Sequence, residues 1–217
     1  MNRTPKALVT GFDPFGGEPV NPSQQIAQAL DGQLIAGHRI VGAILPTEFG
    51  ASLPALEKLL RKHRPAFVLA LGQAGGRAGI SLERVAVNLI DARIPDNAGL
   101  QPVDMAVVEN APNAYFSTLP IKAMLTALCE AGIPAALSQT AGTFVCNQVF
   151  FGLMRLLARR RGARGGFVHV PYLPEQAARR AGAPGVPLET MIVAVRLCLE
   201  TALTTSADEH YAAGSLD

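Results

Sequence analysis

The segment Ser138-Gln-Thr-Ala-Gly-Thr-Phe-Val-Cys-Asn147 connects a short apolar run, Pro134–Leu137, to a longer one, Val149-Phe-Phe-Gly-Leu-Met154. Small and hydroxyl-bearing residues fill the segment, which is typical of a loop. The first apolar run predicts a strand, and the second predicts a helix from Asn147 to about Arg160. The segment therefore predicts a strand, a loop and a helix, with Cys146 at or just before the helix N-terminus.

This position suggests chemistry for Cys146. The unpaired N–H groups and the dipole at a helix N-terminus favour negative charge, and the thiolate is the reactive form of cysteine. We therefore expect a stabilised thiolate and a nucleophile. The alternative is that Cys146 only packs as a small apolar residue, and the residues alone leave both open. Cys129 and Cys198 lie within apolar helical segments and are expected to be buried packing residues.

Apolar segments with strand and helix patterns alternate along the chain, which predicts an α/β domain with a mainly parallel sheet and helices on both faces. Two successive strands, Phe67–Leu71 and Ser81–Leu89, have no helix between them and predict one antiparallel pair, hence a mixed sheet. The other expected strands are Lys6–Thr10, His38–Leu45, Pro134–Leu137 and Gly166–Val170, and the expected helices are Asn21–Leu30, Ser52–His63, Pro120–Ala131, Asn147–Arg160 and Pro187–Leu203.

Composition narrows the class of protein. The chain has 217 residues, of which 49% are hydrophobic and 17% charged, so a single well-cored domain over residues 1–217 is expected. The polar tail Thr204–Asp217 is expected to be loose. The net charge of +2 gives no bias toward nucleic acid or acidic membranes. We expect no signal peptide and no membrane span, and three cysteines do not form a disulfide framework, so the cytoplasm is expected.

Two further residues are candidates for a catalytic site. His169 lies near the C-terminal end of an apolar strand, where catalytic groups of open α/β sheets are found. It is predicted to be a general base for a thiol, or else a core histidine with a satisfied hydrogen bond. Glu83 lies on an apolar strand and is expected to be buried with a partner, either Arg93 or His169. A carboxylate can orient the imidazole of a Cys–His pair, although a simple ion pair with arginine is the alternative.

Other motifs favour weaker hypotheses. The glycine-rich run Gly72–Gly79 lacks the G-x-G-x-x-G order and precedes a strand, so nucleotide binding is disfavoured. Basic residues between Arg155 and Arg164 lie at a helix C-terminus, where cations complement the dipole and stay solvated, and no aromatic residues interleave as nucleic-acid binding would require. No cluster has the spacing of metal ligands, so neither a metal nor a cofactor is expected.

Three long blocks carry a resemblance to a known family. Gly72–Asn88, Leu137–Asn147 and Gly166–Gln176 resemble the glutamate, cysteine and histidine motifs of the pyroglutamyl peptidases of type I, also called pyrrolidone-carboxylate peptidases, which are cysteine peptidases. The stretches Val9–Gly17, Asp91–Asn97 and Ala114–Pro120 are similar too. The resemblance extends from about Lys6 to about Leu203.

The resemblance implies a three-layer α/β/α sandwich, removal of N-terminal pyroglutamate from peptides, no metal or cofactor, and a homotetramer. It implies that Cys146 is the nucleophile, His169 the base and Glu83 the orienting carboxylate, with Arg93 near the oxyanion. A neutral flat lactam suits aromatic walls with a few fixed polar partners. The residues expected to bind it are Phe12, Phe15, Phe144 and Val145 as walls and Gln73 and Asn21, or backbone groups of the same loops, as polar partners.

Two other functions remain as alternatives. An enzyme on a similar sheet that transfers a glycosyl group to phosphate, such as a nucleoside phosphorylase, would use the Gly72–Gly76 loop and would not need Cys146. A binding protein without catalytic activity would keep the pocket but not turn over substrate.

Overall fold

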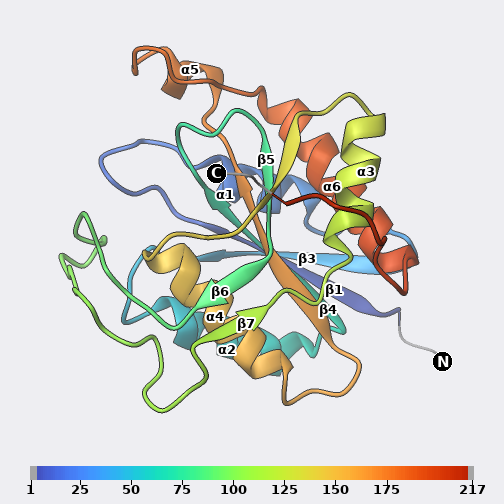
Figure 1. The fold of residues 1–217 in the computed structure, drawn as a ribbon, viewed down its shortest axis with the longest axis horizontal. Coiled ribbons are helices and arrows are strands. Elements are labelled where there is room, and N and C mark those ends of the chain that lie inside the picture. Colours follow the sequence, from blue (N-terminus) through green and yellow to red (C-terminus); the bar gives the residue numbers. More distant parts are fainter. Residues whose placement is uncertain (1–3, 215–217) are drawn as a thin grey trace.

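A computed structural model of the chain describes residues 4–214. Its strands are β1 (Lys6–Phe12), β2 (Leu34–Ile35), β3 (His38–Leu45), β4 (Phe67–Gln73), β5 (Ile80–Glu83), β6 (Val85–Val87), β7 (Ala114–Phe116), β8 (Ala135–Ser138) and β9 (Arg164–Val170). Seven of them form one sheet in the order β2-β3-β1-β4-β9-β5-β8, and β6 pairs with β7 beside it (Figure 1).

Helices cover both faces of the seven-stranded sheet. They are α1 (Pro22–Leu30), α2 (Ser52–His63), α3 (Ile121–Glu130), α4 (Val145–Leu157), the short α5 (Pro174–Ala177) and α6 (Leu188–Thr204). One core lies between the sheet and α1, α3 and α6, and a second lies between the sheet and α2 and α4. The predicted three-layer α/β/α sandwich is confirmed.

The sheet is mixed and mainly parallel, as predicted. Strands β3, β1, β4 and β9 are parallel neighbours, β5 and β8 run parallel to each other but antiparallel to β9, and β2 is antiparallel to β3. The predicted antiparallel pair between Phe67–Leu71 and Ser81–Leu89 is wrong, because β9 lies between β4 and β5. This late strand is apolar on both faces, which suits it to the centre of the sheet.

The segment predicted as one strand, Ser81–Leu89, is two strands in different sheets. Glu83 ends β5, and the chain then turns into β6. The amide of Asn147, fully buried on α4, accepts a hydrogen bond from the N–H of Val87 and donates to the carbonyl groups of Val87 and Leu89. It therefore satisfies the backbone there as a neighbouring strand would. The periodicity of apolar residues in the sequence does not indicate that a side chain takes the place of a neighbouring strand.

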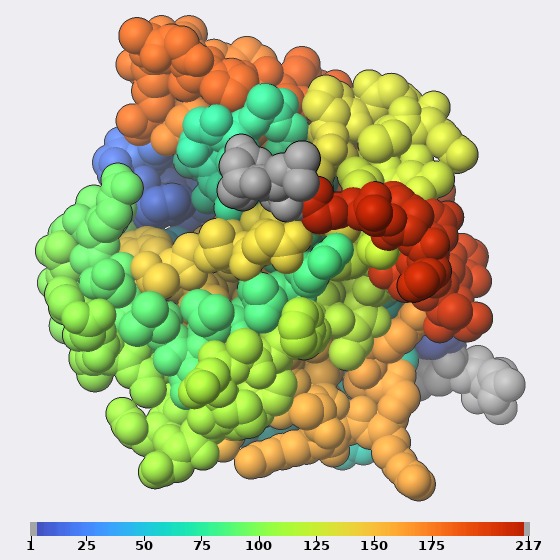
Figure 2. Space-filling model, in the orientation of Figure 1, coloured from blue at the N-terminus to red at the C-terminus, as the bar shows by residue number. Residues whose placement is uncertain are grey.

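The tail expected to be loose contacts α3 as far along the chain as Tyr211 and lies beside this helix on the surface (Figure 2). Residues 215–217 lie outside the described residues. The described part of the tail forms no helix or strand after α6. A carboxylate oxygen of Asp208 accepts hydrogen bonds from the N–H groups of Lys122 and Ala123 at 3.0 Å. It thus caps α3, whose own N-cap residue, Pro120, makes no side-chain cap. Within residues 4–214, no helix is long and apolar enough to cross a membrane.

The carboxyl end of β1 lies against the start of α1, and Gly11 permits this contact. Replacing Gly11 with alanine should destabilise the fold, because a Cβ there would lie 2.1 Å from the carbonyl oxygen of Ser23 and 2.8 Å from the nitrogen of Gln24. We expect the free energy of unfolding to fall by about 1–3 kcal/mol, the usual cost of overpacking, in urea denaturation.

The matched control is Gly50→Ala, because Gly50 is exposed and a Cβ there would meet nothing within 4 Å. Equal stability of the two variants would contradict a tight contact between β1 and α1.

Candidate active site

A cavity of about 490 Å³ opens at the carboxyl ends of β4 and β9. Ligands of open α/β sheets bind outside this edge. Its walls come from the first loop, the loop after β4, the segment after β6, the loop before α4 and β9: Phe15, Gln73, Ala74, Gly75, Arg77, Asp91, Arg93, Ile94, Ala141, Gly142, Thr143, Phe144, Cys146 and His169. Two of the three residues predicted as catalytic, Cys146 and His169, thus line one cavity.

The sheet brings Gly72, His169 and Glu83 to its α4 face. Side chains along a strand alternate between faces, and the residue before each of these three packs in the core beneath α1, α3 and α6. The register of β4 and β9 pairs Gly72 with His169. A Cβ on Gly72 would lie 2.8 Å from Sγ of Cys146, so the sulfur lies over the backbone position directly beside His169.

Glu83 reaches His169 across the antiparallel pair of β5 and β9. Ser81 is the register partner of His169, and Glu83 is its diagonal neighbour on the same face, within reach of a long side chain. Nδ1 of His169 lies 2.7 Å from Oε1 of Glu83, and both residues are buried. An ionised carboxylate only accepts hydrogen bonds, so Nδ1 donates, and in the neutral imidazole Nε2 is then the nitrogen with the lone pair. Of the two partners predicted for Glu83, the structure supports His169 and not Arg93.

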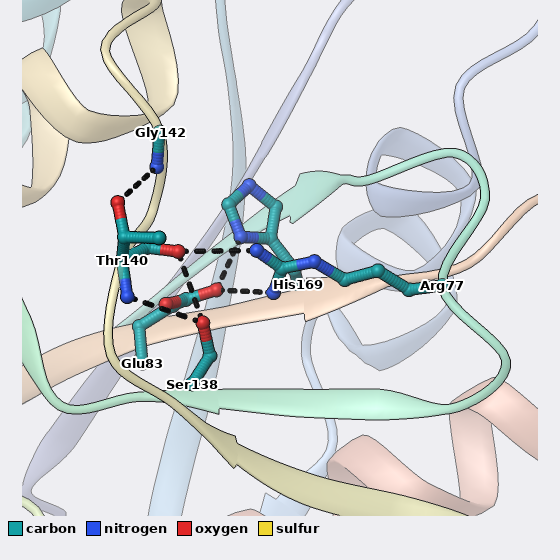
Figure 3. A network of polar contacts seen from close by, with 6 residues as sticks. All are labelled: Arg77, Glu83, Ser138, Thr140, Gly142 and His169. Carbon is teal, nitrogen blue, oxygen red and sulfur yellow. Dashed lines mark hydrogen bonds and ion pairs between the residues drawn. The ribbon is translucent and has the colours of Figure 1, made fainter. Parts of the chain in front are cut away.

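Arg77 is a site residue that the sequence interpretation missed. Its Nη1 lies 2.6 Å from Oε1 of Glu83, the same oxygen that His169 uses, and its Nη2 donates to the carbonyl of Thr140 at 3.1 Å (Figure 3). In the sequence, only the position of Arg77 pointed to such a role, because it lies six residues before Glu83 within the glycine-rich run.

Glu83 stays ionised although it is fully buried. Burial alone would raise the pKa of its carboxyl group, but the hydrogen bond and charge of His169, followed by Ser138 and Arg77, hold that pKa below its ordinary value. The Ser138 hydroxyl donates to the carbonyl of Thr140 at 2.9 Å. Oε2 of Glu83 has no hydrogen-bond partner within the described part of the chain.

Cys146 lies in the first turn of α4, which begins at Val145, two residues earlier than predicted. No side chain of the N-cap residue, Phe144, caps this helix, so its first N–H groups are available to a ligand. Burial, followed by the charge of Glu83, nevertheless raises the pKa of the Cys146 thiol to about 12, although Arg77 and the N–H of Cys146 itself act in the opposite direction. The direction of this shift favours a thiol that a base deprotonates over a thiolate stabilised by the helix alone, although the residue itself is only half-buried.

Aromatic side chains form one wall of the cavity. Phe15 and Phe144, both predicted, line it with their ring centroids 6.0 Å apart, and Phe49 meets Phe144 edge to face at 5.2 Å. Phe12 does not line the cavity: it is 1% exposed and packs on Phe167. The prediction of Phe12 as a wall residue is therefore corrected to a supporting role behind the site.

The structure also revises several other predicted contacts. Asn21 is buried and uses its whole amide to cap α1: Oδ1 accepts from the N–H and hydroxyl of Ser23, and Nδ2 donates to the carbonyl of Asp13. It is not a cavity residue. Val145 is fully buried beside Cys146 and does not line the cavity either. Arg93 does line it and is exposed.

Gln73 lines the cavity, but its side-chain oxygen is already occupied. Oε1 accepts a hydrogen bond of 3.1 Å from Nε2 of Gln176, which also donates to Glu18 and to the carbonyl of Val20. The residue before it, Gly72, faces Cys146, so the side chain of Gln73 starts from the opposite face of the sheet. Any contact of Gln73 with a ligand is therefore best made by its main chain.

Features away from the cavity offer no competing site. The basic residues at the end of α4 line another cavity, of about 680 Å³, at the opposite edge of the sheet, together with Arg61 and Arg64 from the end of α2. Cys198 is buried as predicted, whereas Cys129 is exposed, contrary to expectation. Among residues 4–214, no group of three or more His, Cys, Asp or Glu side chains could hold a metal ion.

A mixed α/β sheet with a cysteine at a helix N-terminus, a nearby histidine and a carboxylate that orients the imidazole defines the class of cysteine hydrolases. Residues 5–205 match the family model of pyroglutamyl peptidase. The chain is similar to pyrrolidone-carboxylate peptidase of Cupriavidus taiwanensis, at 55% identity over 98% of this chain and 99% of the relative. It has the same identity and coverage with pyrrolidone-carboxylate peptidase 1 of Ralstonia nicotianae.

Solved structures of pyroglutamyl peptidases also match this chain. The crystal structure of pyroglutamyl peptidase I from Bacillus amyloliquefaciens matches with a TM-score of 0.91 and 46% identity, over 94% of this chain and 100% of that one. A mutant pyrrolidone carboxyl peptidase from Pyrococcus furiosus matches with a TM-score of 0.89 and 45% identity, over 91% of this chain and 98% of that one. The chain belongs to the pyroglutamyl peptidase family of cysteine peptidases.

The closeness of Gly72 to the sulfur gives a test of the site geometry. We expect Gly72→Ala to slow alkylation of Cys146 by iodoacetamide about tenfold, since a Cβ there would lie 2.8 Å from both Sγ of Cys146 and the ring of Phe167 and overpacking displaces side chains. Mass spectrometry after timed alkylation gives the rate. Gly50→Ala again serves as the control, and an alkylation rate like that of the parent protein in Gly72→Ala would contradict the placement of the sulfur.

Proposed function

We propose that this protein removes N-terminal pyroglutamyl residues from peptides through a thioester intermediate on Cys146. The observation that carries the proposal is the buried pair of Glu83 and His169, joined at 2.7 Å, beside a cavity lined by both His169 and Cys146. Family membership supports the reaction, because the relatives are pyrrolidone-carboxylate peptidases.

Acylation starts from a neutral thiol. His169 accepts the proton of Cys146 at Nε2, because Nδ1 is held as a donor to Glu83. The sulfur attacks the pyroglutamyl carbonyl carbon, and the carbonyl electron pair moves onto its oxygen. The imidazolium that results lies against the negative charge of Glu83, which stabilises it. When the tetrahedral intermediate collapses, the C–N bond breaks and His169 returns the proton to the departing amine.

The oxyanion of that intermediate forms near the start of α4. The N–H of Cys146 belongs to the first turn of a helix without a side-chain cap, so it is free to donate to the oxygen. Arg93, exposed on the cavity wall, is our proposed second source of positive charge. Water then attacks the thioester, His169 takes its proton, and pyroglutamate leaves as the thiol is restored.

Main-chain groups at the end of β4 are suited to the lactam. The N–H of Ala74 donates to Val170 on β9, so the peptide groups of Gln73 point the other way, toward β1. There the pairing of β1 with β4 ends at Thr10 and Ala70. Phe12 has the next N–H of β1 that could extend the pairing with β4, but this N–H donates to the hydroxyl of Ser23. Gln73 lies three residues past the end of this pairing, so its N–H and C=O are our proposed donor and acceptor for the ring C=O and N–H, while Phe15 and Phe144 pack on the ring.

We further infer a homotetramer in the cytoplasm, as the family resemblance implies. Large apolar side chains that are more than half exposed support self-association: Leu34, Leu100, Val103, Met105, Phe116 and Val193. Sedimentation equilibrium measures the mass directly. The three cysteines are all free, as in a reducing compartment.

The phosphorylase alternative lacks support from the glycine-rich loop. That loop leads into β5, a strand, rather than into a helix N-terminus that would bind phosphate. Its one cation, Arg77, is already paired with Glu83. The alternative of an inactive binding protein depends on turnover and is tested next.

Substitution of the three central residues should separate their roles. We expect hydrolysis of a pyroglutamyl-coumarin amide by the parent protein, loss of turnover in Cys146→Ser and His169→Gln, and reduced but measurable turnover in Glu83→Gln, which keeps a hydrogen bond to the imidazole but not the charge. Fluorescence of the released coumarin measures each rate.

Unchanged turnover in Cys146→Ser would overturn the mechanism. Substrate binding without turnover by the parent protein would favour the binding protein, and phosphate-dependent cleavage of nucleosides would favour the phosphorylase.

Recognition by the main chain makes a distinct prediction for Gln73. Gln73→Met removes the side-chain amide but keeps the peptide groups, so the preference for pyroglutamyl over prolyl amides should remain at least about a hundredfold, the scale of discrimination expected from polar groups left unpaired. Ratios of kcat/KM for the two coumarin amides give the preference. Loss of the preference in Gln73→Met would show that the side chain, and not the main chain, binds the lactam.

A further inference from the structure

Arg77 is held in a fixed direction by the glycine-rich loop between β4 and β5. Gly76 has a φ of +88°, which turns the chain back toward the sheet. A Cβ on Gly75 would lie 1.9 Å from the ring of Tyr172, and one on Gly79 would lie 2.3 Å from the carbonyl oxygen of Pro134. Both glycines therefore allow close contacts that fix the loop on either side of Arg77.

The guanidinium joins two parts of the site that are distant in sequence. Its two terminal nitrogens bond the carboxylate of Glu83 on β5 and the carbonyl of Thr140 in the loop before α4 (Figure 3). That loop is itself ordered by the hydroxyl of Ser138, which donates to the same carbonyl, and by Gly142, whose N–H donates to the Thr140 hydroxyl. The planar fork of arginine suits this double contact, which a lysine ammonium would not reproduce.

The charge of Arg77 has a second consequence. Glu83 is fully buried, so its negative charge needs a neighbouring cation whenever His169 is neutral. Apart from His169, Arg77 is the only cation that forms an ion pair with Glu83 in the described part of the chain. Its side chain is 31% exposed, so its guanidinium retains contact with water while its inner edge meets the carboxylate.

We propose that Arg77 is a positioning residue of the reaction, which balances the charge of Glu83 while His169 is uncharged and ties that carboxylate to the loop that precedes α4 and Cys146. The inference rests on the proposed function for the identity of the reaction, but its electrostatic part concerns only the cysteine, the histidine and the glutamate. A purely structural brace would hold the loop without affecting proton transfer.

The other charged groups that face this cluster are few. Cys146 on α4 and His169 on β9 line the cavity, and Glu83 on β5 contacts His169. Asp91 and Arg93 line the cavity from the segment after β6. Neither Asp91 nor Arg93 forms an ion pair with any residue between 4 and 214. Both are exposed and remain in every variant below, so removal of Arg77 changes one charge in an otherwise constant set.

The test uses three variants of Arg77 that separate charge from hydrogen bonding. Arg77→Met removes both, Arg77→Gln keeps hydrogen-bond donors without charge, and Arg77→Lys keeps the charge without the double contact. Arg159→Met is the control for net charge, because Arg159 is exposed and lies thirteen residues beyond Cys146 along and past α4, about 20 Å away. The pH dependence of kcat/KM for the pyroglutamyl-coumarin amide and of iodoacetamide alkylation is measured for each.

Loss of a positive charge favours the protonated forms of the groups around it. We therefore expect the acid limb of both pH profiles to move to higher pH by about one unit in Arg77→Met and Arg77→Gln, and to stay in place in Arg77→Lys and Arg159→Met. Arg77→Lys should still lower kcat/KM about tenfold, because the hydrogen bond to the carbonyl of Thr140 in the loop before α4 is lost.

An acid limb that stays in place in both neutral variants, whether or not kcat/KM falls, would overturn the proposal and leave Arg77 a structural brace. Equal shifts in Arg77→Lys and Arg77→Met would overturn it as well. The alkylation profile needs no substrate, so it tests Arg77 even if the parent protein fails to hydrolyse the coumarin amide, whereas that failure would overturn the proposed function alone. Thermal unfolding of each variant identifies any that fails to fold. If Arg77→Met or Arg77→Gln fails, the pH profile of the other neutral variant tests the proposal.

Discussion

The hydrogen bond between Glu83 and His169 is the interaction on which the rest of the site depends. It requires two strands that are 86 residues apart in the chain to be antiparallel neighbours, with Ser81 opposite His169 so that Glu83 falls on the diagonal. A shift of one residue in this register would turn the carboxylate to the other face of the sheet. The site also depends on where β5 ends. The chain leaves the main sheet for β6 just after Glu83, so the end of β5 stays beside Ser138 and the loop that precedes α4.

Burial strengthens the electrostatic interaction between Glu83 and His169, and it also disfavours negative charge on the nearby sulfur. Burial of the sulfur, followed by the charge of Glu83, raises the pKa of the Cys146 thiol and favours its neutral form despite its place in the first turn of a helix. The same carboxylate stabilises the imidazolium that forms when His169 accepts the thiol proton. The site therefore disfavours charge on sulfur at rest and favours the paired charges of the reacting state. While His169 is uncharged, Arg77 remains the cation that is paired with Glu83.

Much of the fold was predictable because it follows local patterns. His38–Leu45 and Ser52–His63 have the predicted bounds, and the alternation of strands and helices gave the layered class. The pairing of Phe67–Leu71 with Ser81–Leu89 was wrong because strand order depends on β9, which enters the sheet late in the chain. Cys146, His169 and Glu83 carried recognisable signals of residue type and position. Arg77 did not, because an arginine in a glycine-rich loop has many possible partners until the tertiary structure places it. Asn21 and Phe12 were predicted as pocket residues, but a cap and a core contact satisfy them instead.

The proposed recognition of a lactam by main-chain groups would explain why no side chain in the sequence identified the polar part of the pocket. Every residue has one N–H and one C=O, and only the end of a strand pairing decides which of them are open to a ligand. Here the pairing of β1 with β4 ends at Thr10 and Ala70, and the N–H of Phe12 donates to the hydroxyl of Ser23. Ser23 in turn is held by the amide of Asn21. If the main chain of Gln73 binds the lactam as proposed, Asn21 acts on recognition only indirectly, through the hydroxyl of Ser23 and the end of β1 that this hydroxyl contacts.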